Sequence, residues 1–126
     1  MHKIKKRILI VEDERHISKL VKVILEKNSF EVLQAFDGQG GIDAAKKEKP
    51  DLIILDVMMP GMDGFEVAER LNRMKETKGI PIIMLSSAAQ FKDKMKGLES
   101  GAADYITKPF DKNELVAKVK KHLKPN

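Results

Sequence analysis

Several short apolar runs in this sequence end in side chains that can do chemistry. Such runs, bounded by polar residues, are typical of strands buried on both faces of a sheet. The polar sets are Glu12-Asp13-Glu14 after residues 8–11, Asp56 after residues 52–55, Ser86-Ser87 after residues 80–85, and Thr107-Lys108-Pro109 at the end of residues 103–107. If these runs are parallel strands, at least three carboxylates, a hydroxyl and an ammonium gather at one edge of the sheet, where ligands bind.

The acids of this set favour a metal site with oxygen ligands. Two carboxylates about 4 Å apart repel by roughly 4 kcal/mol at an effective dielectric near 20, so an acidic cluster usually holds a cation. The chain has no cysteine, and hard oxygen ligands select Mg²⁺, Ca²⁺ or Mn²⁺ over zinc. A calcium loop needs acids at alternating positions within one segment, and residues 56–64 lack that pattern. We therefore expect Mg²⁺, with Mn²⁺ as a substitute.

Lys108 and Ser86 would complete a site suited to phosphoryl oxygens. A lysine that faces an acidic metal site can neutralise a carboxylate or hold an incoming anion as a point charge. The Ser86 hydroxyl can donate a hydrogen bond to the same anion, and a metal ion beside both groups would add positive charge. Asp56 is then a candidate nucleophile, because carboxylates form acyl phosphates in proteins.

The elements that must position these residues alternate in type along the chain. Apolar or alternating runs predict five strands, at residues 7–11, 30–35, 51–56, 80–85 and 103–107. Helical spacing predicts five helices. The first carries Ile17, Leu20, Val21, Ile24 and Leu25 on one face, the second spans residues 41–47, the third begins after an N-cap at Asp63, the fourth carries Phe91, Met95 and Leu98, and the last begins near Asp111.

Five strand-then-helix units predict an α/β fold, a five-stranded parallel sheet that is doubly wound with helices on both faces. The 126 residues fit one domain, and no linker or low-complexity segment is left over for a second one. We therefore expect a single domain over residues 1–126.

Composition narrows the class of protein. The net charge is +5, but the lysines alternate with acids and no basic stripe is interleaved with aromatic residues, so we expect no direct binding of nucleic acid. No apolar run approaches the 18 or so residues of a membrane span. The absence of cysteine favours a reducing, cytoplasmic location. His2, His16 and His122 are scattered and suggest no catalysis, and Met58, Met59, Met62, Met84 and Met95 are expected to fill gaps in the core.

The stretches VEDE, LIILDVMMPGMDG, IPIIMLSS and GAADYITKPF, in this order and spacing, resemble the response-regulator receiver domain of two-component signalling. The resemblance covers essentially all of residues 5–124. It implies a flavodoxin-like (βα)5 fold with strand order 2-1-3-4-5. It also implies a phosphoacceptor switch that catalyses only its own phosphorylation and dephosphorylation and is otherwise no enzyme.

The resemblance assigns roles at the acidic edge. Asp56 would accept a phosphoryl group from a sensor histidine kinase, and Lys108 would contact the phosphate. Glu12, Asp13 and Asp56 would bind Mg²⁺ together with the backbone carbonyl of Met58. Glu12 stands where many members have Asp, which favours contact with the metal through water. The Lys108–Pro109 peptide bond would be cis.

Further residues are expected to transmit phosphorylation to a partner. By resemblance, Ser86 is the switch hydroxyl and Tyr105 the switch aromatic. Residues 96–120 look like receivers of winged-helix transcription regulators, which pair through their fourth helix, fifth strand and fifth helix, although Ala103 departs from the acid common at its position. The implied partners are the kinase, a downstream effector or effector domain, and a second copy of the chain in a phosphorylation-dependent dimer.

Two other functions fit parts of the pattern. A flavin-binding flavodoxin-like module would share the strand order, but its phosphate would need a Ser/Thr/Gly-rich loop where this chain has Glu12-Asp13-Glu14. A phosphatase of the haloacid dehalogenase type would use an aspartate nucleophile, but it needs a second Asp two residues later, where this chain has Met58.

Overall fold

The structure is a computed structural model that describes residues 4–86 and 99–125. Its strands are β1 (Arg7–Val11), β2 (Glu31–Ala35), β3 (Leu52–Asp56), β4 (Ile82–Ser86) and β5 (Asp104–Thr107). Its helices are α1 (Arg15–Lys27), α2 (Gly38–Glu48), α3 (Gly64–Arg73) and α5 (Lys112–His122). The helix expected around Phe91, Met95 and Leu98 lies outside the described residues.

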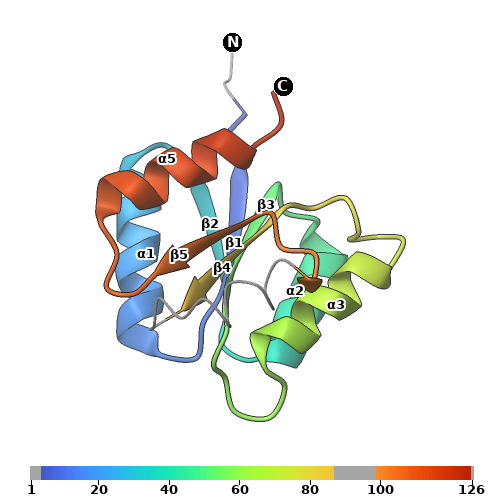
Figure 1. Ribbon diagram of the computed structural model, residues 1–126. Coiled ribbons are helices and arrows are strands. Elements are labelled where there is room, and N and C mark those ends of the chain that lie inside the picture. Colours follow the sequence, from blue (N-terminus) through green and yellow to red (C-terminus); the bar gives the residue numbers. More distant parts are fainter. Residues whose placement is uncertain (1–3, 87–98, 126) are drawn as a thin grey trace.

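The five strands form one parallel sheet in the order β2-β1-β3-β4-β5 (Figure 1), which confirms the expected fold class and strand order. The register pairs Val11 with Leu55, Asp56 with Leu85, and Ser86 with Thr107. Because the paired strands are parallel and in register, their carboxyl ends lie at the same edge of the sheet. The chemistry-bearing residues that follow β1, β3, β4 and β5 are therefore neighbours.

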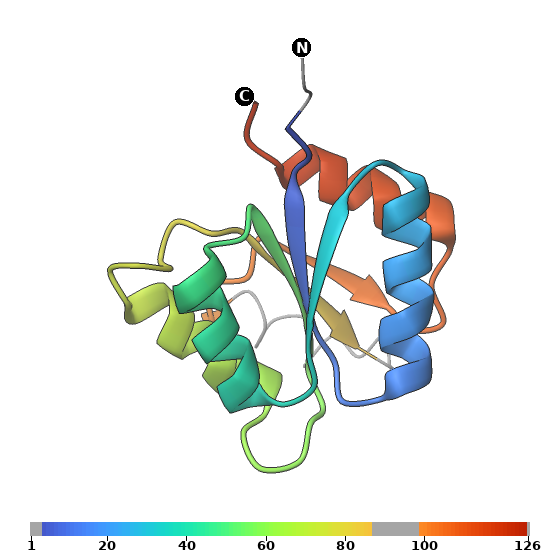
Figure 2. The same cartoon turned by 180° about the vertical axis from the view of Figure 1, so that it is seen from behind.

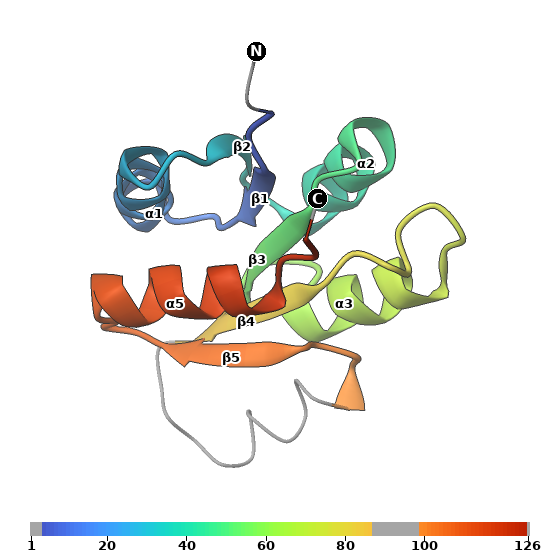
Figure 3. The same ribbon diagram turned by 90° about the horizontal axis from the view of Figure 1, so that it is seen from above.

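Two apolar layers hold the sheet in place. Leu9, Val11 and Leu55 pack with α2 and α3, whereas their chain neighbours Ile8 and Ile10 pack with α1 and α5. Figure 3 shows these two helix pairs on opposite faces of the sheet, and Figure 2 shows the same layers from behind. Each fully buried aliphatic side chain contributes about 1.5–3 kcal/mol relative to exposure. The sheet is thus a rigid platform for side chains at its edge.

Aspartates start three of the four described helices. Asp37, Asp63 and Asp111 each accept a backbone N–H of the first turn, from residues 40, 66 and 113 respectively. The caps expected at Asp63 and near Asp111 are confirmed. The second helix begins at Gly38 rather than at the expected residue 41, because the side chain of Asp37 bonds the Gly40 amide at 2.6 Å and so stabilises the first turn.

Two apolar side chains lie where the sequence pattern did not place them. Leu20 shares its predicted helix face with the buried Val21 and Leu25, but it is 49% exposed because α5 covers only part of that face. Met58 was expected to fill a core gap and is 68% exposed, whereas Met59 is buried. The loop after β3 turns its first methionine outward, directly beyond Asp56. In the described ranges, 4–86 and 99–125, no helix has the length and apolarity to cross a membrane.

Candidate functional site

The site lies at the carboxyl edge of the sheet, where β1 and β3 each deliver acids. Glu12 and Asp13 follow β1 directly, and Asp56 is the last residue of β3. The chain then loops back over Asp56, and the Gly64 amide donates to the carbonyl oxygen of Val57 at 2.8 Å. A Cβ at position 64 would collide with the backbone carbonyl of Asp56. Gly64 is therefore required where the loop closes against the strand end.

Three carboxylates converge as the sequence predicted. Ligand oxygens of Glu12, Asp13 and Asp56 lie within 4.8 Å of one another. Glu12 is 1% and Asp56 3% exposed, and Asp13 is partly exposed. A buried, mutually repelling set of acids is costly unless positive charge is supplied.

Lys108 supplies one positive charge from the end of β5. Its Nζ donates to Glu12 Oε1 at 2.7 Å and to Asp56 Oδ1 at 3.1 Å. The second oxygen of Glu12, Oε2, accepts the backbone N–H of Glu14 at 3.2 Å. Burial alone would lower the pKa of Lys108, but its hydrogen bonds to Glu12 and Asp56 outweigh burial and raise that pKa. Lys108 therefore stays charged at neutral pH.

The pKa of Glu12 shows that one lysine does not supply enough positive charge for this group of acids. Burial raises the pKa of Glu12 to about 7, the hydrogen bond from Lys108 lowers it, and contact with Asp56 raises it further. Without a metal ion, Glu12 therefore keeps its proton to a higher pH than an ordinary glutamate does. One lysine, bonded to Glu12 and Asp56, lies beside a group of three acids, and a divalent cation would supply the positive charge that this group lacks.

The residues present fit Mg²⁺. All the candidate ligand atoms are hard oxygens, and two of the three carboxylates belong to buried residues that strands hold in position. Asp13 is more exposed than the other two, which leaves room for the water molecules that Mg²⁺ keeps in protein sites.

The remaining expected site residues lie on β4, β5 and the loop after β3. Ser86 is buried at the end of β4, and its backbone carbonyl accepts the amide of Lys108, so it adjoins the lysine that contacts Asp56. The Lys108–Pro109 bond is cis, as expected. Tyr105 is 6% exposed and packs in the α2/α3 layer. Met58 follows Asp56 by two residues.

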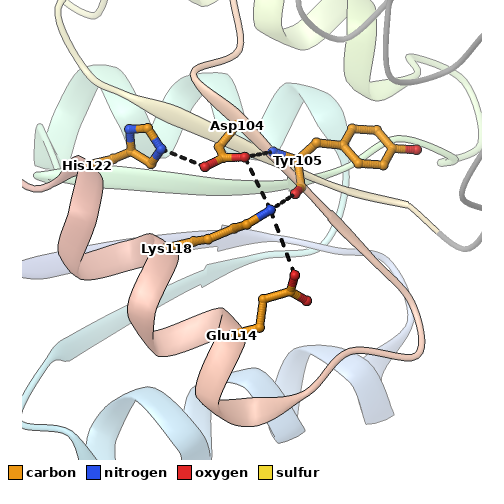
Figure 4. Close-up of polar contacts among 5 residues, drawn as sticks. All are labelled: Asp104, Tyr105, Glu114, Lys118 and His122. Carbon is orange, nitrogen blue, oxygen red and sulfur yellow. Dashed lines mark hydrogen bonds and ion pairs between the residues drawn. The ribbon is translucent and has the colours of Figure 1, made fainter. Parts of the chain in front are cut away.

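One polar cluster was not expected from the sequence. On the face of β5 opposite to the Tyr105 ring, Asp104 contacts His122 and Lys118 of α5 (Figure 4). His122 alone carries no motif, and Asp104 is 18 residues away from it. The available signal was position: both residues fall on the helix-facing side of their elements, as the buried Ile106 and Val119 indicate.

Comparison with known proteins identifies the class. Residues 8–120 match the response regulator receiver domain family, and the chain belongs to that family. It is thus a receiver domain of two-component phosphorelay signalling, a signalling domain rather than a classical enzyme. This confirms the resemblance drawn from the four sequence stretches.

Two relatives are transcription regulators. The chain is 48% identical over 118 residues to the DNA-binding dual master transcriptional regulator RpaA of Synechocystis sp., covering 94% of this chain and 49% of that protein. It is 44% identical over 115 residues to the phosphate regulon transcriptional regulatory protein PhoB of Escherichia coli, covering 91% and 50%. The chain thus spans about half the length of these relatives, and the expected likeness to receivers of winged-helix transcription regulators is confirmed.

A solved structure shares the fold and holds a metal ion. The receiver domain of the sensor histidine kinase PA1611 from Pseudomonas aeruginosa superposes with a TM-score of 0.88 at 26% identity, covering 94% of this chain and 98% of that one. That structure has magnesium coordinated in its active-site cleft.

Proposed function

We propose that this domain is a phosphoacceptor switch in which Asp56 takes a phosphoryl group from the phosphohistidine of a sensor histidine kinase. The observation that carries the proposal is the position of Asp56: its carboxylate is fixed at a strand end, grouped with Glu12 and Asp13, and bonded by Lys108 at 3.1 Å. Two acids and one lysine around a single carboxylate form a site for a cation and an anion together.

The transfer itself needs few groups. An Asp56 carboxylate oxygen attacks phosphorus, the N–P bond of the phosphohistidine breaks, and the histidine nitrogen keeps the electron pair. Glu12, Asp13, Asp56 and the Met58 backbone carbonyl would hold Mg²⁺ or Mn²⁺, with Glu12 reaching it through water. When bound, the ion supplies positive charge that offsets the phosphoryl oxygens. Lys108 donates to one of those oxygens, and the Ser86 hydroxyl to another.

The output is a change of the β5–α5 side of the molecule. We propose that Ser86 moves toward the phosphoryl group and that Tyr105 rotates into the space it leaves, which alters the surface formed by the fourth helix, β5 and α5. Relatives that regulate transcription support an effector or a second copy of the chain as the partner of this surface. We expect the domain to act in the cytoplasm, in keeping with a chain that has no cysteine.

The two other functions considered lack support in the geometry. The loop after β1 presents Glu12 and Asp13 to the site, and these acids would repel a flavin phosphate. Position 58, where a phosphatase would need its second aspartate, holds a methionine with an exposed side chain.

Acetyl phosphate with Mg²⁺ tests the phosphoacceptor directly. Intact mass spectrometry should show one added phosphoryl group, peptide mapping should place it on Asp56, and Asp56→Asn should abolish labelling. The matched control is Asp63→Asn, a nearby aspartate that caps α3 and should leave labelling intact. Equal labelling of Asp56→Asn and the wild type would overturn the assignment.

Self-association is measured separately. Light scattering across a protein dilution series, with and without beryllofluoride and Mg²⁺, should show a weak, salt-sensitive dimer only in the activated sample. An activated protein that stays monomeric at high micromolar concentration would leave an effector as the partner of this surface.

A further inference from the structure

Asp13 is held in the acid cluster differently from the other two acids. Glu12 directly follows β1 and Asp56 ends β3, and both are buried and bonded by Lys108. Asp13 is partly exposed and lies at a bend between β1 and α1, and its carboxylate has no hydrogen bond to another residue that the structure describes. The backbone of this bend therefore determines where the Asp13 carboxylate points.

The helix that follows the bend, α1, starts without a side-chain cap. The helices α2, α3 and α5 each begin after an aspartate whose side chain accepts a backbone N–H of the first turn. The N-cap of α1 is Glu14, and its side chain makes no such bond. A side-chain cap stabilises the first turn of a helix, and α1 lacks this means of holding its start and the bend before it.

Arg15 makes a contact at the start of α1 that can serve in place of a cap. Its guanidinium carbon lies 3.6 Å from the centre of the Phe36 ring, in the loop between β2 and α2. At this distance the face of an aromatic ring attracts a cation. Arg15 is the first residue of α1, where the helix dipole disfavours positive charge, and it forms no ion pair with another described residue. The ring is therefore the attractive partner that favours this position of the arginine.

The backbone around Phe36 is fixed on both sides of the ring. The preceding residue, Ala35, ends β2, and the following residue, Asp37, bonds the first turn of α2. A Cβ at Gly38 would lie 3.0 Å from the Cβ of Met62, so the start of α2 packs closely against the loop after β3. The half-buried Phe36 ring is therefore a fixed surface against which a flexible arginine side chain can be ordered.

The bend at Asp13 is thus attached to the end of β2 on both sides. Before Asp13, the Glu12 amide donates to the Ala35 carbonyl oxygen at 3.1 Å, and after it Arg15 stacks on Phe36. We propose that Arg15 and Phe36 are positioning residues: their stack holds the bend so that Asp13 points into the acid cluster, and it thereby raises the affinity of the acidic edge for Mg²⁺. The second part of this inference rests on the proposed function, whereas the first part, the holding of the bend, does not.

Nuclear magnetic resonance on the metal-free protein tests whether the stack holds the bend. In Phe36→Leu, which removes the ring but keeps the charge of Arg15, ¹⁵N relaxation should report lower order at the amides of Asp13 and Glu14 than in the wild type. Phe36→Tyr restores an aromatic face and should restore this order. Amides of Asp13 and Glu14 that are equally ordered in the wild type and in Phe36→Leu would overturn the proposal.

Calorimetric titration of the same proteins with Mg²⁺ tests the effect on the metal site. Phe36→Leu and Arg15→Gln should each weaken Mg²⁺ binding roughly two- to fivefold, which corresponds to the loss of one exposed cation–π contact. The double variant should bind no more weakly than either single variant, because both changes remove the same contact. Phe36→Tyr, and Lys19→Gln at another exposed cation of α1, should bind like the wild type.

The direction of the change separates positioning from simple charge repulsion. Loss of a positive charge close to a cation site would by itself strengthen Mg²⁺ binding. Tighter binding by Arg15→Gln, or wild-type binding by Phe36→Leu, would therefore overturn the positioning role. If Asp13→Ala leaves Mg²⁺ binding unchanged, the ion does not occupy the acidic edge; the metal site of the proposed function then fails together with the positioning role, while the relaxation measurement still decides whether the stack holds the bend.

Discussion

The acidic edge of the sheet can be compared with the polar cluster between β5 and α5, formed by Asp104, Glu114, Lys118 and His122 and called the β5 clamp. Both contain a lysine between two carboxylates, but the pKa of an acid is raised in the first and lowered in the second. In each, one lysine lies between two carboxylates: Lys108 between Glu12 and Asp56, and Lys118 between Asp104 and Glu114. Burial separates them, since the side chain of Glu12 is 1% and that of Asp104 20% exposed. The pKa of Glu12 is raised to about 7, and the pKa of Asp104 is lowered.

Different physical effects determine the pKa of the acid in each cluster. At the acidic edge, burial and a second carboxylate outweigh the single lysine, so the site is left short of positive charge. In the clamp, hydrogen bonds from His122, Tyr105 and Lys118 outweigh a smaller burial penalty. The first cluster can therefore take up a cation, whereas in the second the Asp104 carboxylate already accepts hydrogen bonds from groups of its own chain.

Substitution of the lysine in each cluster should give the largest difference in stability between the two clusters. Lys108→Met leaves two buried acids without their positively charged partner, and we expect a loss of about 4 kcal/mol in the free energy of unfolding at pH 8 without metal. Lys118→Met, the matched control at the more exposed cluster, should cost less than about 1 kcal/mol. Urea denaturation in a chelating buffer measures both. Equal losses would show that burial does not distinguish the clusters.

The raised pKa of Glu12 predicts a pH dependence of the metal-free protein. The folded state holds the Glu12 proton more tightly than the unfolded chain does, so stability is fully present below the ordinary value of 4.5 and is lost as the pH rises through about 7. The expected decline is about 3 kcal/mol.

The variant Glu12→Gln isolates this contribution. It should show no such decline between pH 5 and 8, because its amide does not titrate. If the wild-type protein and Glu12→Gln lose stability in parallel, the proton is held elsewhere.

Bound Mg²⁺ should supply the positive charge that the acidic edge lacks and so stabilise the folded protein. Stabilisation by a ligand is RT ln(1 + [L]/Kd), about 2.7 kcal/mol at a hundredfold excess over Kd. The effect should be larger at pH 8 than at pH 6, since at the lower pH the ion must displace the Glu12 proton. Asp13→Ala should remove most of the shift in Tm, while Asp43→Ala, on the exposed side of α2, should keep it. An unchanged shift in Asp13→Ala would place the ion at another site.

The smallest effect is expected at Asp104. Its lowered pKa means that its bonds stabilise the fold above the ordinary value of 3.8 and that this stability is lost as the pH falls below it. At pH 7, Asp104→Asn should cost about 0.5–1 kcal/mol, and the difference from wild type should shrink in acid. A cost that persists unchanged in acid would mean that packing, not charge, holds the clamp.

Much of the fold followed from local pattern. The apolar runs gave the strands because β3 and β4 are buried on both faces, and caps such as Asp63 marked helix starts. Leu20 was misplaced because periodicity defines a helix face but not how much of it a neighbour covers. The predicted start of α2 at residue 41 was three residues too late, because glycine has a low helix propensity and the pattern does not show that the Asp37 side chain stabilises the first turn from Gly38.

The site was predictable in part for a different reason. Parallel strands bring their carboxyl ends together, so the sequence alone predicts that Glu12, Asp56 and Lys108 lie close to one another. The distances between these residues and their protonation states could not be predicted, because the pKa of Glu12 depends on how deeply the whole sheet buries it. The outward turn of Met58 and the pairing of His122 with Asp104 depend on loop curvature and helix placement, which no local pattern encodes.

The segment before β1 and the segment after α5 lie close together at Lys6 and Lys124, on the side of the sheet away from Asp56. Lys6 and Lys124 line one small pocket with Pro50 and Pro81, which precede β3 and β4, and Figure 1 shows the start of β1 and the end of α5 on the same side of the molecule. A five-residue strand, about 17 Å long, separates that side from the acidic edge. Neighbouring ends suit a domain for insertion into a surface loop of a host protein. A chimaera built in this way would keep the acidic edge open to phosphodonors and pass any strain in α5 directly into the host.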